Sequence, residues 1–147
     1  MSTNQRTIKA SPTAVWDVLA DGWLYPLFVV GASRMREVDR TWPAVGAKLH
    51  HSVGAWPMLL NDKTEVLECD PHRQLVLRAH AWPSGAARVV LTLETDPTEP
   101  NHTRVTIEED VESGPGRLVP KPARDVQLAW RNVETLRRLA YVAERRP

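Results

Sequence analysis

A change of hydrophobic period constrains this chain more than any other feature. From Ser33 to Val111, apolar and polar residues alternate in short runs separated by turn-forming residues, and a single helical pattern then covers residues 123–144. Alternation with a period of two predicts strands, and short turns between successive strands predict antiparallel pairing. A meander of this kind followed by one long amphipathic helix predicts a sheet that wraps around the helix and leaves a cavity.

Local signals place the other elements. Ser11 is an N-cap residue directly before Pro12, so a helix is expected to begin there and to end at Asp21-Gly22. A second, broken helical segment is expected around Pro26. The fold class is therefore α+β, with about seven strands and two short helices after the first strand. The strands are expected at residues 6–10, 34–38, 48–53, 58–69, 74–81, 88–95 and 103–111.

Length and charge limit the possible functions. The 147 residues are expected to form one domain, residues 1–147. With 19 basic and 18 acidic residues the net charge is +1, so binding to nucleic acid is not expected. Cys69 is the only cysteine, and the first residues have no apolar segment after a basic start, which favours a cytoplasmic protein. No apolar run approaches the roughly 18 residues of a membrane span.

The last helix has one apolar side. On a helical wheel Arg131, Arg137 and Arg138 lie mostly away from that side, whereas Asn132 falls within it. The Asn132 amide would either bond to a nearby loop backbone or point into a cavity. The apolar side is expected to pack on the sheet and consists of Ala129, Val133, Leu136, Leu139, Ala140 and Ala143.

Several short motifs follow one another along the chain: Val29-Val30-Gly31, Val38-Asp39, Trp42-Pro43, His50-His51-Ser52-Val53-Gly54, Thr64-Glu65-Val66-Leu67-Glu68 with Asp70-Pro71, and Arg131-Asn132-x-Glu134-x-Leu136. Together with the order of elements, these motifs resemble the polyketide cyclase/dehydrase-like branch of the START/Bet v 1-type (SRPBCC) superfamily. The resemblance covers almost the whole chain. It implies a helix-grip fold with an apolar cavity that holds lipids, sterols, aromatic polyketides or other hydrophobic molecules in relatives. It does not imply one mechanism, because such folds include carriers, sensors and enzymes.

Strand alternation identifies polar residues that would face this cavity. Glu109 shares the phase of Val105, Ile107 and Val111, and His51 shares that of Leu49 and Val53. The phase that turns Val66 inward also turns Thr64 and Asp62 inward. A tight turn between the two strands would place Asp62 close to His51. The candidate polar ligand-binding residues are His51, Asp62, Thr64, Glu109 and Asn132.

These residues allow two interpretations. A histidine beside a carboxylate can act as a general acid or base near neutral pH, which would suit proton abstraction or dehydration of a ketone substrate. Each residue also has a structural explanation. His51 can be a half-buried structural histidine, Asp62 can be solvated near its turn, and Glu109 can bond to the loop at residues 113–116.

The six tryptophans divide between core and rim. Trp16 lies on the apolar side of the first helix and is expected in the core. Four others stand in loops or at the ends of elements, and among these Trp23 and Trp56 are the best candidates for ligand contact. Trp130 lies at the edge of the last helix's inner side, where it would divide the cavity.

Metal and cofactor sites are not expected. His50 and His51 are adjacent on a strand, so their side chains leave opposite faces and cannot chelate one ion. Gly114-Pro115-Gly116 lacks the Lys-Ser/Thr of a phosphate loop, and no Gly-x-Ser-x-Gly motif occurs.

Three functions remain compatible with the sequence. The first is binding of a small hydrophobic molecule, which requires only an apolar cavity with a few orienting polar groups. The second is a polyketide cyclase, aromatase or dehydratase that uses the internal His and Glu as acid–base groups. The third is a regulatory interaction module, suggested by the Arg-rich end of the chain, Arg137, Arg138, Arg145 and Arg146.

Overall fold

A computed structural model of the chain describes residues 2–29, 32–53, 60–81 and 85–145. Seven antiparallel strands form one sheet in the order β1-β7-β6-β5-β4-β3-β2. The expected α+β fold is confirmed. The elements are β1 (Ser2–Ile8), α1 (Pro12–Ala20), η1 (Gly22–Leu24), α2 (Tyr25–Phe28), β2 (Ala32–Val38), β3 (Lys48–Val53), β4 (Leu60–Asp70), β5 (Gln74–Ala81), β6 (Gly85–Thr95), β7 (Thr103–Ser113), η2 (Pro115–Leu118) and α3 (Lys121–Glu144).

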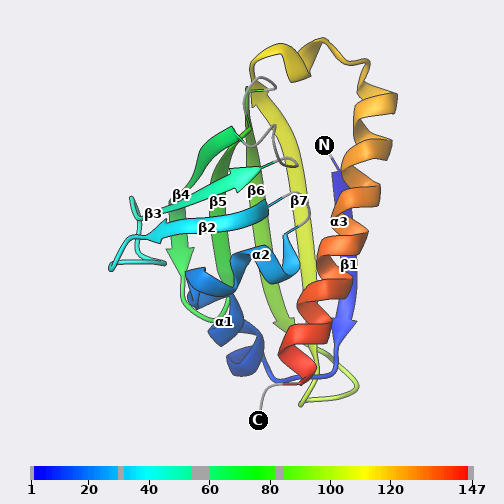
Figure 1. The fold of residues 1–147 in the computed structure, drawn as a ribbon. Helices are drawn as coiled ribbons and strands as arrows, with labels where there is room; N and C mark the ends of the chain where they lie inside the picture. Colours follow the sequence, from blue (N-terminus) through cyan, green and yellow to red (C-terminus); the bar gives the residue numbers. More distant parts are fainter. Residues whose placement is uncertain (1, 30–31, 54–59, 82–84, 146–147) are drawn as a thin grey trace.

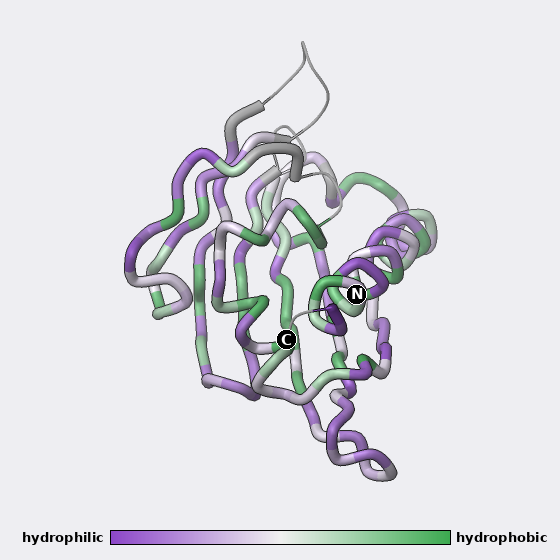
Figure 2. The backbone as a smooth tube through the Cα atoms, turned by 60° about the horizontal axis from the view of Figure 1, so that its bottom comes forward, coloured by the Kyte–Doolittle hydropathy of each residue, from purple (hydrophilic) through white to green (hydrophobic). Residues whose placement is uncertain are grey.

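The sheet curves, and the helices lie on one side of it (Figure 1). The long helix α3 runs beside β1 and β7, while α1 and α2 lie at one end of the sheet and contact both α3 and neighbouring strands. Green and purple segments alternate along the strands in Figure 2, as expected for a sheet with one buried face. This is the helix-grip arrangement. No helix among the described residues is long and apolar enough to cross a membrane.

Helix α1 begins where its capping signals predict. The Ser11 hydroxyl accepts a hydrogen bond from the Ala14 amide at 3.2 Å, and Pro12 occupies the first turn. Four apolar side chains of the helix are buried, and the indole of Trp42 donates to the Leu19 carbonyl at 3.1 Å. The helix is thereby fixed against the loop before β3. Its buried residues are Val15, Trp16, Val18 and Leu19.

A tight approach at Gly22 positions the next segment. A Cβ atom at Gly22 would lie 2.5 Å from a methyl group of Leu49 and 2.7 Å from one of Val38. A larger residue at position 22 would force these two side chains to shift, so glycine lets η1 lie directly on Val38 of β2 and Leu49 of β3. Pro26 lies in the first turn of α2 rather than interrupting it, which is where a helix tolerates proline. As a result, Tyr25 and Phe28 are buried.

Strand β1 differs most from its predicted range. It covers Ser2–Ile8 rather than residues 6–10. All seven of its residues pair with β7, from Ser2 opposite Glu109 to Ile8 opposite Thr103. The pairing partner, not the weak hydrophobic pattern of β1, fixes its extent. The loop expected between β7 and α3 also contains a short 3-10 turn, Pro115–Leu118.

Helix α3 is rotated relative to the predicted apolar side. Val133, expected inside, is 52% exposed, whereas Asn132 and Thr135 are buried. The prediction for Val133 was wrong because the inner side of α3 does not contact an entirely apolar surface. Polar side chains on this side face the cavity described below. The buried residues of α3 are Leu128, Asn132, Thr135, Leu136, Leu139, Ala140 and Ala143.

Candidate functional site

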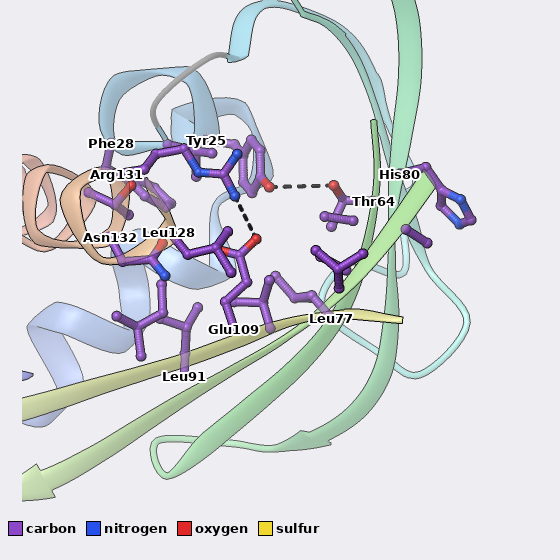
Figure 3. Close-up of a pocket in the computed structure, with 18 of the residues that line it drawn as sticks. Tyr25, Phe28, Thr64, Leu77, His80, Leu91, Glu109, Leu128, Arg131 and Asn132 are labelled. Carbon is purple, nitrogen blue, oxygen red and sulfur yellow. Dashed lines mark hydrogen bonds and ion pairs between the residues drawn. The ribbon is translucent and has the colours of Figure 1, made fainter. Parts of the chain in front are cut away.

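A cavity of about 350 Å³ lies between the inner face of the sheet, α2 and α3 (Figure 3). Its volume is at the small end of the range of about 300–1,000 Å³ for ligand pockets. Most of its wall is apolar, because inward positions of the three strands β5, β6 and β7 and the buried side of α3 meet there. Apolar lining residues are Leu19, Phe28, Val29, Leu75, Leu77, Ala79, Ala86, Ala87, Val89, Leu91, Ile107, Val111, Val119, Leu128 and Leu139.

Three polar side chains in the wall form a hydrogen-bonded chain. The Thr64 hydroxyl lies 3.0 Å from Nε2 of His51 and 3.4 Å from the Tyr25 hydroxyl. The rings of Tyr25 and His51 also stack, with centroids 5.6 Å apart. Thr64 and His51 lie on adjacent strands, and Tyr25 reaches them from α2. The two strands and α2 thus hold one connected set of proton-carrying groups.

Burial determines the ionisation of the Tyr25 and His51 side chains in this hydrogen-bonded set. Removal from water lowers the pKa of His51 below its ordinary value of 6.5, and the nearby Asp62 carboxylate opposes this only in part. Burial likewise raises the pKa of Tyr25 above 10.0. Both side chains are therefore neutral at pH 7. The side chains of Tyr25, Thr64 and His51 can therefore donate and accept hydrogen bonds while all three are uncharged.

An ion pair crosses from the sheet to the helix at the same cavity. Glu109 of β7 is 3% exposed, and its Oε2 accepts a hydrogen bond of 2.6 Å from the Arg131 guanidinium. Figure 3 shows Arg131 reaching from α3 toward Glu109. A buried carboxylate requires such a partner. The pair explains how β7 holds an acidic residue among Val105, Ile107 and Val111.

Three buried side-chain nitrogens have no hydrogen-bond partner among the protein atoms that the structure describes. They are Nδ1 of His51, Nε of Arg124 and Nδ2 of Asn132. All three residues line the cavity. Asn132 is only 2% exposed and projects from α3 toward the strands (Figure 3). Since buried polar groups are normally paired, these nitrogens are available to a ligand.

Exposed residues of the first half of α3 form part of the cavity wall. Trp130 lines the cavity but is 70% exposed, so it forms part of the rim and does not divide the interior as expected. Arg124 also lines this part of the wall, and one of its terminal nitrogens lies 3.6 Å from Asp110.

The structure brings five of the eight predicted ligand-binding residues to the cavity wall. The five are His51, Thr64, Glu109, Trp130 and Asn132.

Asp62 and Trp23 lie elsewhere. Asp62 is opposite His51 in the strand pairing, as predicted, but it does not line the cavity. Thr64 is fully buried, whereas Asp62 is half-buried two residues nearer the strand end, so the cavity ends between them. Trp23 is 58% exposed and borders a separate surface hollow beside Asp21 and Asp39. Trp56 lies outside the described residues.

Sequence reasoning missed Tyr25 and Arg131. Tyr25 belongs to a segment predicted only as a broken helix, and no periodicity marks its inward side. Arg131 was predicted to lie away from the sheet side of its helix. One signal was present: an inward Glu109 needs a cationic partner, and Arg131 is adjacent to the inward Asn132. Within the described residues, no three His, Cys, Asp or Glu side chains are grouped as a metal site requires.

Comparison with solved structures shows the same fold in several proteins. Protein NE0264 from Nitrosomonas europaea superimposes with a TM-score of 0.73 at 17% identity, over 97% of this chain and 92% of that chain. Ara h 8.0201 gives a TM-score of 0.70 at 11% identity, over 98% and 97%. The di-domain ARO/CYC StfQ from the steffimycin biosynthetic pathway gives 0.71 at 10% identity. The superposition covers 97% of this chain and 49% of StfQ.

The sequence itself matches one family. No curated protein sequence matches the chain. The profile of the family described as polyketide cyclase / dehydrase and lipid transport, however, matches residues 2–144, nearly the whole chain. Together with the helix-grip fold and its cavity, this match shows that the chain belongs to the polyketide cyclase / dehydrase and lipid transport family.

Proposed function

We propose that this protein binds a small hydrophobic molecule in the cavity between its sheet and α3. The observation that carries the proposal is a cavity of about 350 Å³ with mostly apolar walls and a few buried polar groups. Sites of this composition are typical of small-molecule binding. A molecule of lipid-like, aromatic or polyketide-like character would bury apolar surface there, and the polar groups would orient it.

The comparisons support this class of ligand. The family description names both lipid transport and polyketide cyclisation or dehydration. The StfQ protein is described as an ARO/CYC of a biosynthetic pathway. These functions share a hydrophobic cargo or substrate, which is the property that the cavity of this chain can satisfy.

Titration with N-phenyl-1-naphthylamine, a neutral apolar fluorophore, tests the proposal. We expect saturable binding with increased fluorescence. The variant Val89→Phe adds a ring on the inner face of β6, where Val89 lines the cavity, and should reduce the affinity at least tenfold. Arg88→Phe adds the same ring at the exposed neighbouring position and should leave the affinity unchanged.

Two results would contradict the proposal. One is the absence of saturable binding to the wild-type protein. The other is an equal loss of affinity in Val89→Phe and Arg88→Phe, which would place the fluorophore outside the cavity. Thermal unfolding of both variants checks that each remains folded.

The chain of Tyr25, Thr64 and His51 supports a second candidate, acid–base catalysis of a dehydration. A neutral imidazole can accept the α-proton of a β-hydroxyketone, and the β-hydroxyl leaves as water with the proton of the Tyr25 hydroxyl. The proton on His51 then passes through Thr64 to Tyr25, which restores both groups. His51 is better placed than Glu109 for this role because Arg131 already binds the Glu109 carboxylate. The test is conversion of 3-hydroxy-1-(2-naphthyl)butan-1-one to its enone. Binding of this compound without conversion, or equal conversion by His51→Gln, would reject catalysis.

The basic end of α3 does not favour the interaction module. Arg137 and Arg138 both bind Glu134, at 2.6 Å and 2.9 Å. The Arg145 guanidinium lies 3.6 Å from the centre of the Tyr141 ring. These three arginines are engaged within the helix.

A further inference from the structure

The cavity has an excess of hydrogen-bond donors. Asn132 Nδ2 and Arg124 Nε have no partner among the described protein atoms, and both can only donate. Both residues line the cavity, and Asn132 is 2% exposed. A buried donor without a partner destabilises a protein unless a ligand supplies an acceptor.

The chain of Tyr25, Thr64 and His51 adds one further donor. With His51 neutral, these three side chains carry one polar hydrogen each, and they form two hydrogen bonds with one another. Whichever group donates in each of the two bonds, one of the three polar hydrogens has no acceptor among these side chains. In one arrangement it is on Nδ1 of His51, the buried nitrogen without a partner. All three side chains line the cavity, so in each arrangement the remaining hydrogen belongs to its wall.

The charged groups of the wall are already neutralised. Glu109 binds Arg131 at 2.6 Å, and Arg124 lies 3.6 Å from Asp110. Among the lining residues that the structure describes, the remaining ionisable one apart from Tyr25 and His51 is His80, and it points away from the cavity in Figure 3. An ionised ligand would therefore lose its hydration without gaining an unpaired counter-charge.

We propose that the cavity selects neutral hydrophobic molecules that carry a carbonyl oxygen, and that the side-chain amide of Asn132 donates to this oxygen. This inference rests on the proposed function and specifies its ligand class. A ketone oxygen has two lone pairs and no hydrogen, so it can accept from Asn132 and from the remaining hydrogen of the Tyr25 chain together. A hydrocarbon would leave both donors buried and unpaired. A fatty-acid carboxylate would place a third charge beside Glu109.

Three compounds of nearly the same shape test the proposal by equilibrium dialysis. They are 2-acetylnaphthalene, 2-isopropenylnaphthalene and 2-naphthoate. We expect the ketone to bind about tenfold more tightly than the alkene and the carboxylate, the effect of about one hydrogen bond of 1.4 kcal/mol. Equal binding of the ketone and the alkene, or tightest binding by naphthoate, would overturn the proposal. Binding of none of the three by protein that binds N-phenyl-1-naphthylamine would overturn the carbonyl proposal alone. Failure to bind the fluorophore as well would overturn the proposed function itself.

Variants on α3 identify the donor. Asn132→Leu retains the shape of the side chain but cannot donate, so it should reduce the preference for the ketone to twofold or less. Val133→Asn keeps Asn132 and adds an amide at a neighbouring position that is 52% exposed, so it should retain the preference for the ketone. An undiminished preference in folded Asn132→Leu would reject Asn132 as the donor.

A measurement on the wild-type protein needs no variant. The carbonyl carbon of 2-acetylnaphthalene labelled with ¹³C should resonate downfield of its position in cyclohexane when the compound is bound, because hydrogen bonding polarises the C=O bond. A bound signal at the cyclohexane position would show a carbonyl without a donor and would overturn the proposal.

Discussion

At the scale of single residues, the pair of Glu109 and Arg131 shows how exposure decides the cost of losing a partner. The Glu109 side chain is 4% exposed and that of Arg131 is 40% exposed. Water can therefore solvate Arg131 when Glu109 is replaced, but it cannot reach Glu109 when Arg131 is replaced. The two substitutions are expected to differ although each removes one charge of the same ion pair.

We predict that Arg131→Met lowers the free energy of unfolding by about 3–5 kcal/mol, the cost of leaving the buried Glu109 carboxylate without its partner. Glu109→Gln should lower it by less than about 1 kcal/mol, since the Gln oxygen still accepts from Arg131. Urea unfolding measures both values. Arg137→Met, which removes an exposed ion pair of the same helix, is the control and should cost at most about 0.5 kcal/mol. Equal costs for Arg131→Met and Glu109→Gln would contradict this account.

His51 makes stability depend on pH. Its pKa is lower in the folded protein than the ordinary 6.5 because it is buried, so the unfolded chain binds more protons between these two values. The contribution of neutral His51 is complete above pH 6.5 and is lost as the pH falls toward its folded pKa. The free energy of unfolding should therefore decrease from pH 7.5 to pH 5 more steeply in the wild-type protein than in His51→Gln. Parallel pH profiles would show that His51 is not held neutral by the fold.

At the scale of elements, predictability follows the locality of the signal. Helix α1 was predicted well because Ser11 and Pro12 act on their own first turn. The strands β3 and β5 were predicted with their observed bounds because alternation and turn residues mark both ends. The extent of β1 and the exposure of Val133 on α3 were not predicted, since they depend on contacts with β7 and the sheet, which are distant in sequence.

The capping hydrogen bond at α1 gives a prediction for one element. Ser11→Ala removes the acceptor of the Ala14 amide and should lower the free energy of unfolding by about 1 kcal/mol. Thr13→Ala, at an exposed position two residues later, is the matched control and should have little effect. A cost no larger for Ser11→Ala than for Thr13→Ala, measured by urea unfolding, would mean that the cap contributes nothing.

At the scale of the whole molecule, the order of elements was sufficient to predict the fold, because an antiparallel meander with one long helix has few ways to bury its apolar faces. The inward placement of His51, Thr64, Glu109 and Asn132 followed from strand phase and helix side. The contact of Glu109 with Arg131 did not follow. It joins β7 to α3 across 22 residues and depends on how far the helix is rotated on the sheet.

The most direct test of the central claim is where a bound apolar molecule lies. Intermolecular nuclear Overhauser effects between N-phenyl-1-naphthylamine and assigned methyl groups of the protein answer this question. We predict effects to Leu77, Leu91 and Ile107, which line the cavity from three strands. Val126 and Val133, which are 71% and 52% exposed on α3, should show none. Effects to these exposed valines without effects to the strand methyl groups would place the molecule on the surface and contradict a ligand-binding cavity.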